Sequence, residues 1–297
     1  MVAAPEGGLY PFAPHLFDRG GGIRMHYLDE GKGDPVVLLH GNPSWSFLWR
    51  DLVKDLRGGF RCVAPDHVGC GRSDFPGEDR YSYVLKSRVD DLDSLLSHLG
   101  ISTKVTLILH DWGGMIGMAW AARHPDRVSR LVVMNTAAFR MMEGKALPRE
   151  LAWARNPILG PLLIRGLNLF VRGSVRRCTV KPLPPEVAAA YRAPHGSWSR
   201  RLSVLRFVED IPLGPGDASW PVLEQTERAL PRFGNVPTLL CWGMRDFVFD
   251  GDFLAEWTRR FPGAEVHRFE DAGHWLLEDA GDRIVPIVRR FLQAHPA

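Results

Sequence analysis

Short apolar runs alternate along the chain with longer stretches in which apolar residues recur at helical spacing. The short runs predict β-strands, and the longer stretches predict helices. The predicted strands occupy residues 35–40, 60–65, 105–110, 128–134, 237–242 and 265–269. Residues 23–29 alternate apolar and polar side chains instead, which predicts a half-exposed edge strand.

Three of the longer stretches predict helices that pack on this sheet. The clearest covers residues 83–99, where apolar residues share one face and Gly100 follows as a stop. Residues 48–53 and 283–292 give two more. Because strands and helices alternate, the sequence predicts the α/β class, with a mostly parallel sheet covered by helices on both faces.

The pattern changes between residues 139 and 230. This stretch is helical where it is periodic, contains many prolines and has no convincing buried strand. We interpret it as a helical cap inserted into an α/β core formed by residues 1–138 and 231–297. Its basic residues are interpreted as a solvated face rather than an anion site. They are Arg165, Arg172, Arg176, Arg177 and Lys181.

Composition and charge narrow the class of protein. The 297 residues are 45% hydrophobic, which is ample for a large core. The 37 basic and 34 acidic residues largely interleave and leave a net charge of +3, which is too small to argue for nucleic acid or a membrane surface as a partner. We expect the cysteines to be buried thiols, and nothing indicates a metal or cofactor. The cysteines are Cys62, Cys70, Cys178 and Cys241.

Two further observations bear on where the protein resides. The first eight residues lack the basic and apolar regions of a signal peptide. No apolar run in the sequence is long enough to cross a bilayer. We therefore expect a cytoplasmic protein without a membrane span.

Residues 105–120 contain the most informative motif. An apolar strand is followed by a polar pair, two glycines and a helical stretch, which predicts a sharp turn with Asp111 at its apex. Gly113 and Gly114 would allow the helix to pack close to the strand. A carboxylate is already ionised at pH 7, so Asp111 can act as a nucleophile without a neighbouring base.

Two later residues complete a nucleophile–acid–histidine order, each on a loop after a strand. Asp246 follows the strand that ends at residue 242, and His274 follows the strand that ends at residue 269. We predict that Asp111, Asp246 and His274 form a catalytic triad. Asn135, at the end of an earlier strand, is an amide and cannot serve as the acid. Asp250 and Asp252 remain alternatives to Asp246.

This set of residues implies a covalent mechanism. Attack by Asp111 on carbon forms an ester, His274 can activate the water that splits it, and Asp246 fixes the imidazole tautomer. The Trp112 indole and the Asn42 amide can donate to a leaving group or oxyanion, as can the backbone N–H groups after Asp111 and Gly41. His40 is interpreted as structural.

Four motifs together resemble the haloalkane dehalogenase family of the α/β-hydrolase superfamily. They are HGNPSWSFLWR at 40–50, HDWGG at 110–114, WGMRD at 242–246 and GH at 273–274. The combination of Asn42, Trp112, Asn135 and Asp246 is similar to the third dehalogenase subfamily. Other segments look most like its β-lactone decarboxylase branch, which acts in bacterial olefin biosynthesis. These are SRVDDLD at 87–93, GMIG at 114–117, NTAAF at 135–139 and DIPL at 210–213.

The resemblance implies an α/β-hydrolase fold and two candidate activities. The first hypothesis is decarboxylation of a cis-3-alkyl-4-alkyl-oxetan-2-one to a cis-alkene and CO2, and the alternative is hydrolysis of a haloalkane. Both imply a small hydrophobic substrate and an apolar pocket under the cap. The first implies assembly with other olefin-biosynthesis enzymes. Candidate cap residues for the pocket are Trp153, Leu163, Leu167, Phe170, Trp198, Leu205 and Phe207.

Other members of the fold fit less well. Epoxide hydrolases are expected to present cap tyrosines, and Tyr191 is the only tyrosine of the inserted segment. Fluoroacetate dehalogenases would need arginines where Met115 and Ile116 lie, and esterases are expected to use serine. A catalytically silent receptor would typically lose a triad member, whereas all three are present.

Overall fold

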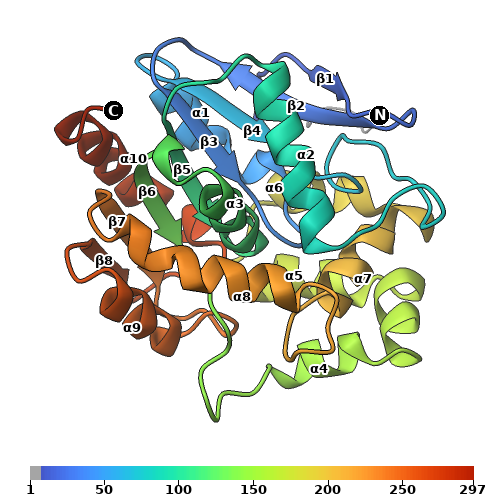
Figure 1. The fold of residues 1–297 in the computed structure, drawn as a ribbon. Coiled ribbons are helices and arrows are strands. Elements are labelled where there is room, and N and C mark those ends of the chain that lie inside the picture. The colour runs from blue at the N-terminus through green and yellow to red at the C-terminus, as the bar shows by residue number, and fades with distance from the viewer. Residues whose placement is uncertain (1–7) are drawn as a thin grey trace.

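A computed structural model describes residues 8–297, so the expectation about the N-terminal segment falls largely on residues 1–7, outside the described range. One sheet holds eight strands in the order β1-β2-β4-β3-β5-β6-β7-β8 (Figure 1). Strand β2 pairs antiparallel with both neighbours, and the other five pairings are parallel. The strands are β1 (His15–Asp18), β2 (Arg24–Glu30), β3 (Pro35–Leu39), β4 (Arg61–Pro65), β5 (Val105–His110), β6 (Val128–Met134), β7 (Thr238–Gly243) and β8 (Glu265–Phe269).

All six of these predicted strands are present, and residues 23–29 also form a strand, β2, but its predicted place at the edge of the sheet is wrong. Strand β2 lies between β1 and β4, and its four residues from Met25 to Leu28 are buried. The edge is β1, which the sequence reasoning missed because four residues with alternating exposure give little periodic signal. His26, a polar residue that suggested exposure, is buried against the Asp66 carboxylate at 2.8 Å.

Helices cover both faces of the sheet because successive strand side chains point to opposite sides. Leu38 of β3 packs in a cluster with residues of α1 and α10, whereas Leu39 packs in a second cluster with residues of α2, α3 and α9. Helix α10 begins earlier than predicted and contains Pro286. The bounds are α1 (Arg50–Leu56), α2 (Leu85–His98), α3 (Trp112–Arg123), α9 (Gly251–Arg260) and α10 (Leu276–Ala294).

The segment after β6 is helical, as predicted, and within the described residues it contains no strand before β7. Its last helix, α8, lies against α3 of the core (Figure 1). Its helices are α4 (Arg149–Arg155), the π-helical turn η3 (Pro161–Gly166), α5 (Leu169–Arg177), α6 (Pro185–Arg192), α7 (Leu202–Glu209) and α8 (Trp220–Ala229). Short 3-10 turns are η1 (Ser46–Trp49), η2 (Pro125–Arg127), η4 (Ala193–His195), η5 (Ser199–Arg201) and η6 (Leu230–Phe233).

Two expectations about the chain as a whole can be compared with the structure. All four cysteines are buried and unpaired, which confirms that they are buried thiols. Among residues 8–297, no helix is long and apolar enough to cross a membrane.

The glycines after Asp111 set how closely α3 approaches the sheet. A Cβ atom on Gly113 would lie 1.9 Å from the Leu39 carbonyl oxygen, and one on Gly114 would lie 1.9 Å from Thr136 Oγ1. Contacts this short require the backbone to move. The glycines are therefore needed to hold the start of α3 against β3 and the β6 end.

Gly113→Ala is expected to lower the free energy of unfolding by roughly 1–3 kcal/mol or more, because the added methyl group meets the β3 backbone. Gly281→Ala is the matched control, since a Cβ atom at this α10 position meets nothing within 4 Å. Its effect should stay below about 1 kcal/mol. Urea denaturation of both variants checks this prediction, and equal stabilities would contradict it.

Candidate active site

Asp111 lies between β5 and α3 with a φ of 51°, a backbone conformation that non-glycine residues seldom adopt. Its amide donates to the Asn135 carbonyl at 3.2 Å, and its own carbonyl accepts a hydrogen bond from the Thr136 hydroxyl. A Cβ atom on Gly41 would lie 1.8 Å from Asp111 Oδ1, so the loop after β3 passes directly over the carboxylate. The turn therefore presents a nearly buried carboxylate at the predicted apex.

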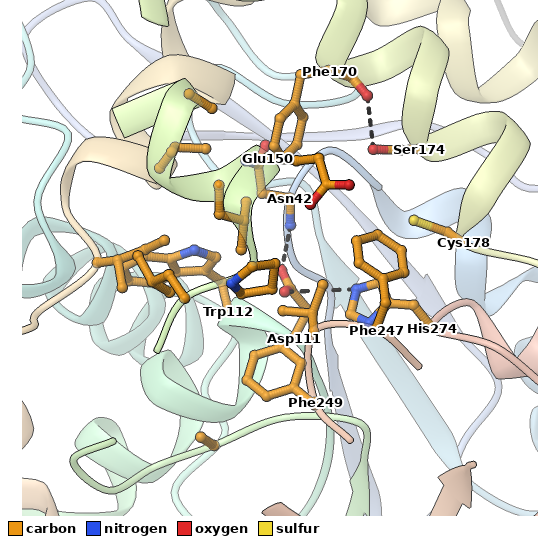
Figure 2. A pocket seen from close by; sticks show the side chains of 18 of the residues that line it. Asn42, Asp111, Trp112, Glu150, Phe170, Ser174, Cys178, Phe247, Phe249 and His274 are labelled. Carbon is orange, nitrogen blue, oxygen red and sulfur yellow. Dashed lines mark hydrogen bonds and ion pairs between the residues drawn. The ribbon is translucent and has the colours of Figure 1, made fainter. Parts of the chain in front are cut away.

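The structure brings the three predicted triad residues together. His274 Nδ1 lies 2.8 Å from Asp246 Oδ2, and His274 Nε2 lies 3.7 Å from Asp111 Oδ2. Figure 2 shows His274 pointing toward Asp111 beneath the pocket. Asp246 also accepts a hydrogen bond from the Val248 amide at 2.7 Å. One imidazole thus bridges two carboxylates.

The charges of this group are coupled. Burial alone would lower the pKa of His274, but the adjacent Asp246 and Asp111 carboxylates raise it above its ordinary value. Burial favours the neutral form of Asp246, yet His274 and the donated hydrogen bonds hold the pKa of that carboxyl below its usual range. Burial raises the pKa of Asp111, against the opposing effects of His274 and two backbone N–H groups. The arrangement therefore keeps the Asp246 carboxylate ionised.

Asn135 has a role that the sequence reasoning missed. Its Nδ2 donates to Asp246 Oδ2 at 2.8 Å, and its Oδ1 accepts from the Gly243 amide at 2.8 Å. Its φ is 38°, another rarely occupied backbone conformation. Its amide side chain cannot serve as the acid, but its hydrogen bond holds the Asp246 carboxylate in position. Its place at the end of β6 was the available signal.

The predicted donors surround the Asp111 carboxylate. The Asn42 backbone N–H donates to Asp111 Oδ1 at 2.6 Å, and the Trp112 backbone N–H also donates to this carboxylate. Asn42 Nδ2 donates to the Val204 carbonyl of α7 at 3.1 Å, which leaves its second hydrogen free for a ligand. Within residues 8–297 the Trp112 indole N–H forms no hydrogen bond with the protein, its side chain lines the cavity described below, and its ring packs against Phe207 at 5.2 Å.

A cavity of about 440 Å³ opens above these groups, and its walls are mostly apolar (Figure 2). Asn42, Asp111, Trp112 and His274 form part of its lining. Of the cap residues proposed for this role, Trp153, Leu163 and Phe170 line the cavity. The other four do not line it: two are exposed outside the cavity and two are buried. The exposed pair is Leu167 and Trp198, and the buried pair is Leu205 and Phe207.

The alternative acids and His40 lie outside the reacting group. Asp250 and Asp252 both pair with the Lys145 ammonium. His40 Nδ1 donates to the Gly41 carbonyl at 2.8 Å and its Nε2 accepts from the His67 amide at 3.2 Å, which supports a structural histidine.

Two further neighbours of His274 were not predicted. His110 Nε2 donates to the His274 carbonyl at 2.8 Å, and the Phe249 ring stacks on the imidazole at 5.9 Å. His110 directly precedes the apex residue, so the strand that presents Asp111 also fixes the histidine loop. These contacts join distant loops, and no local pattern in the sequence indicates them.

A family model for the alpha/beta hydrolase fold matches residues 34–281. The chain belongs to the α/β-hydrolase family. This hydrolase-family chain is 48% identical to the cis-3-alkyl-4-alkyloxetan-2-one decarboxylase of Shewanella oneidensis, with 96% of this chain and 89% of that protein covered. It is 36% identical to haloalkane dehalogenase 2 of Mycobacterium tuberculosis, with 97% and 98% covered.

Solved structures support the same placement of this α/β-hydrolase. The haloalkane dehalogenase of Agrobacterium tumefaciens superposes with a TM-score of 0.86 over 98% of this chain and 100% of that chain, at 26% identity. The predicted fold class and the predicted resemblance to the haloalkane dehalogenase family are therefore confirmed.

The raised pKa of His274 can be measured directly. As the pH falls, His274 should take up a proton at a pH above the ordinary imidazole value of about 6.5. Asp246→Asn should move this titration to lower pH, because it removes the adjacent negative charge. Histidine NMR of 15N-labelled protein checks both expectations. His40 is the internal control, since burial lowers its pKa to about 4. An unshifted His274 titration in Asp246→Asn would contradict the coupling.

Proposed function

We propose that this enzyme is a β-lactone decarboxylase that converts a cis-3-alkyl-4-alkyl-oxetan-2-one into a cis-alkene and CO2. The observation that carries the proposal is the 48% identity, over nearly the whole chain, to a decarboxylase with this substrate in its name. The identity to the haloalkane dehalogenase is lower, at 36%. The site supports the same chemistry. The Asp111 carboxylate lies beneath an apolar cavity, together with two side-chain donors that have a free N–H, the Asn42 amide and the Trp112 indole.

In the proposed first step, Asp111 attacks ring carbon C4 and the C4–O ring bond breaks. The product is an ester between Asp111 and C4, and the former ring oxygen becomes part of a free carboxylate on C3. The Trp112 indole and the second Asn42 amide hydrogen are placed to hold this anion. Strain in the four-membered ring favours its opening.

In the second step, the C3 carboxylate leaves as CO2, its bond electrons form the double bond, and the Asp111 carboxylate departs from C4. Atoms and charge balance without water. Inversion at C4 followed by anti departure gives the cis-alkene from the cis-lactone. The charge that returns to Asp111 meets the backbone N–H groups of Asn42 and Trp112 and the nearby His274.

The same residues support the alternative activity, haloalkane dehalogenation. Asp111 would displace a halide held by Trp112 and Asn42, and His274 would then remove a proton from the water that hydrolyses the ester. The observation that favours this alternative is the close superposition on a solved haloalkane dehalogenase. The two activities differ in whether the ester is broken by elimination or by water.

The proposal also includes a cellular setting. We place the enzyme in the cytoplasm, supported by four buried cysteines that remain unpaired. We further propose that it works in an assembly with the other enzymes of olefin biosynthesis, which would supply its apolar lactone substrate.

Asp111→Asn is expected to reduce alkene formation by more than about 10³-fold, because the amide is not a nucleophile but keeps an oxygen for the Asn42 amide. Asp252→Asn is the matched control, since that exposed aspartate pairs with Lys145 outside the site. Activity is measured by gas chromatography of the alkene, and folding by circular dichroism. Near-normal turnover by folded Asp111→Asn would rule out the covalent mechanism.

Competing substrates separate the two activities. We expect purified enzyme to convert a synthetic cis-β-lactone into alkene and to release little bromide from 1,2-dibromoethane. Gas chromatography detects the alkene and an ion assay detects bromide. Rapid bromide release with no alkene would favour the dehalogenase and overturn the decarboxylase proposal.

A further inference from the structure

Exposed apolar side chains concentrate on the helical segment that follows β6. Of the ten large hydrophobic residues that are exposed within residues 8–297, nine lie between residues 139 and 230. We define the cap patch as six of them: Trp153, Ile158, Leu159, Leu162, Leu167 and Trp198. Ile158 is 80% exposed and Trp153 is 59% exposed. Isolated exposed apolar residues are ordinary, but a cluster of this size marks a binding surface.

The cap patch is continuous. Trp153 lies on α4, Leu162 lies on η3 and Trp198 directly precedes η5, and η3 contacts both α4 and η5. These elements lie together at one end of the molecule (Figure 1). The space beside Gly166 is bounded by Leu162 and Trp198, and the Arg165 guanidinium stacks on the Trp198 ring at 4.4 Å.

The cap patch also adjoins the cavity over the catalytic carboxylate. Trp153 both lines this cavity and is largely exposed. The same holds for Leu169 at the start of α5, which is 47% exposed. An apolar compound that enters or leaves the cavity can therefore pass along apolar side chains rather than through water.

The stretch of chain that carries the cap patch has more basic than acidic residues. Residues 149–209 contain 11 Lys or Arg residues and three Asp or Glu residues, whereas the rest of the chain contains 26 and 31. The expectation that charges largely interleave is therefore wrong for this segment, because a small net charge of +3 conceals two opposite regions.

Several of these basic residues have no carboxylate partner. Within residues 8–297, Arg165, Arg172 and Arg176 form no ion pair, although Arg177 pairs with Glu150 at 2.7 Å. Leu169, Arg172 and Arg176 lie three and four positions apart on α5 and are exposed, so they share one stripe of that helix. Apolar and cationic side chains thus face outward side by side.

We propose that the cap patch and its flanking arginines bind the surface of an anionic lipid bilayer, with the cavity mouth facing the membrane. Exposed leucines and tryptophans can enter the headgroup region, and unpaired arginines attract anionic lipid. A second copy of the chain is disfavoured as the occupant, because symmetric pairing would bring two basic surfaces together. The protein would bind peripherally, since no described helix spans a membrane.

Vesicle flotation with the purified full chain tests this proposal without any substrate, so its outcome is independent of the proposed activity. We expect binding to vesicles rich in phosphatidylglycerol at low salt, and much weaker binding to pure phosphatidylcholine or at high salt. Ile158→Glu combined with Leu162→Glu should reduce binding at least about tenfold, because two apolar contacts become charged. Arg172→Glu combined with Arg176→Glu should abolish the preference for anionic lipid.

Leu16→Glu is the matched control, because Leu16 is the one exposed large hydrophobic residue of the described chain outside this segment. It should bind like the unmodified protein, and circular dichroism confirms that each variant is folded. Three results would overturn the proposal: no binding to either vesicle, equal binding by all folded variants, or a stable dimer in light scattering that Ile158→Glu with Leu162→Glu dissociates.

Discussion

The site depends on keeping one carboxylate charged in a nearly dry environment. Burial alone raises the pKa of Asp111, and a protonated Asp111 would not be a nucleophile. Backbone N–H groups of Asn42 and Trp112 and the nearby imidazole of His274 limit this rise in the pKa of Asp111. Asp246 in turn raises the pKa of His274, so Asp246 stabilises the charge on Asp111 indirectly, through the imidazole. The apolar cavity above it is chemically useful only because these partners are in place.

The sheet supplies these partners in order. Strands β3, β5, β6, β7 and β8 are consecutive neighbours, and the loops that follow their carboxyl ends carry Asn42, Asp111, Asn135, Asp246 and His274. Parallel strands place all five loops at one edge of the sheet. Residues far apart in the sequence therefore meet without a dedicated local motif, and the close packing of α3 against β3 fixes the position of the first.

The strands and the residues that follow them could be predicted because buried parallel strands leave continuous apolar runs, and Asp111 lies in a turn with a strong glycine signal. The contacts could not be predicted in the same way. Asn135 positions Asp246 through a hydrogen bond between loops, and β1 is too short to give a periodic pattern. The sequence could not distinguish Trp153 from Trp198, since both are tryptophans of the same helical segment. Only Trp153 lines the cavity.

The central claim is that Asp111 becomes covalently bonded to substrate carbon during turnover. Rapid acid quenching during turnover of a cis-β-lactone, followed by proteolysis and mass spectrometry, tests it most directly. The account predicts a transient increase, equal to the whole mass of the lactone, on the peptide that contains Asp111. Alkene formation with that peptide unmodified at every quench time, or an adduct on another residue, would contradict the account.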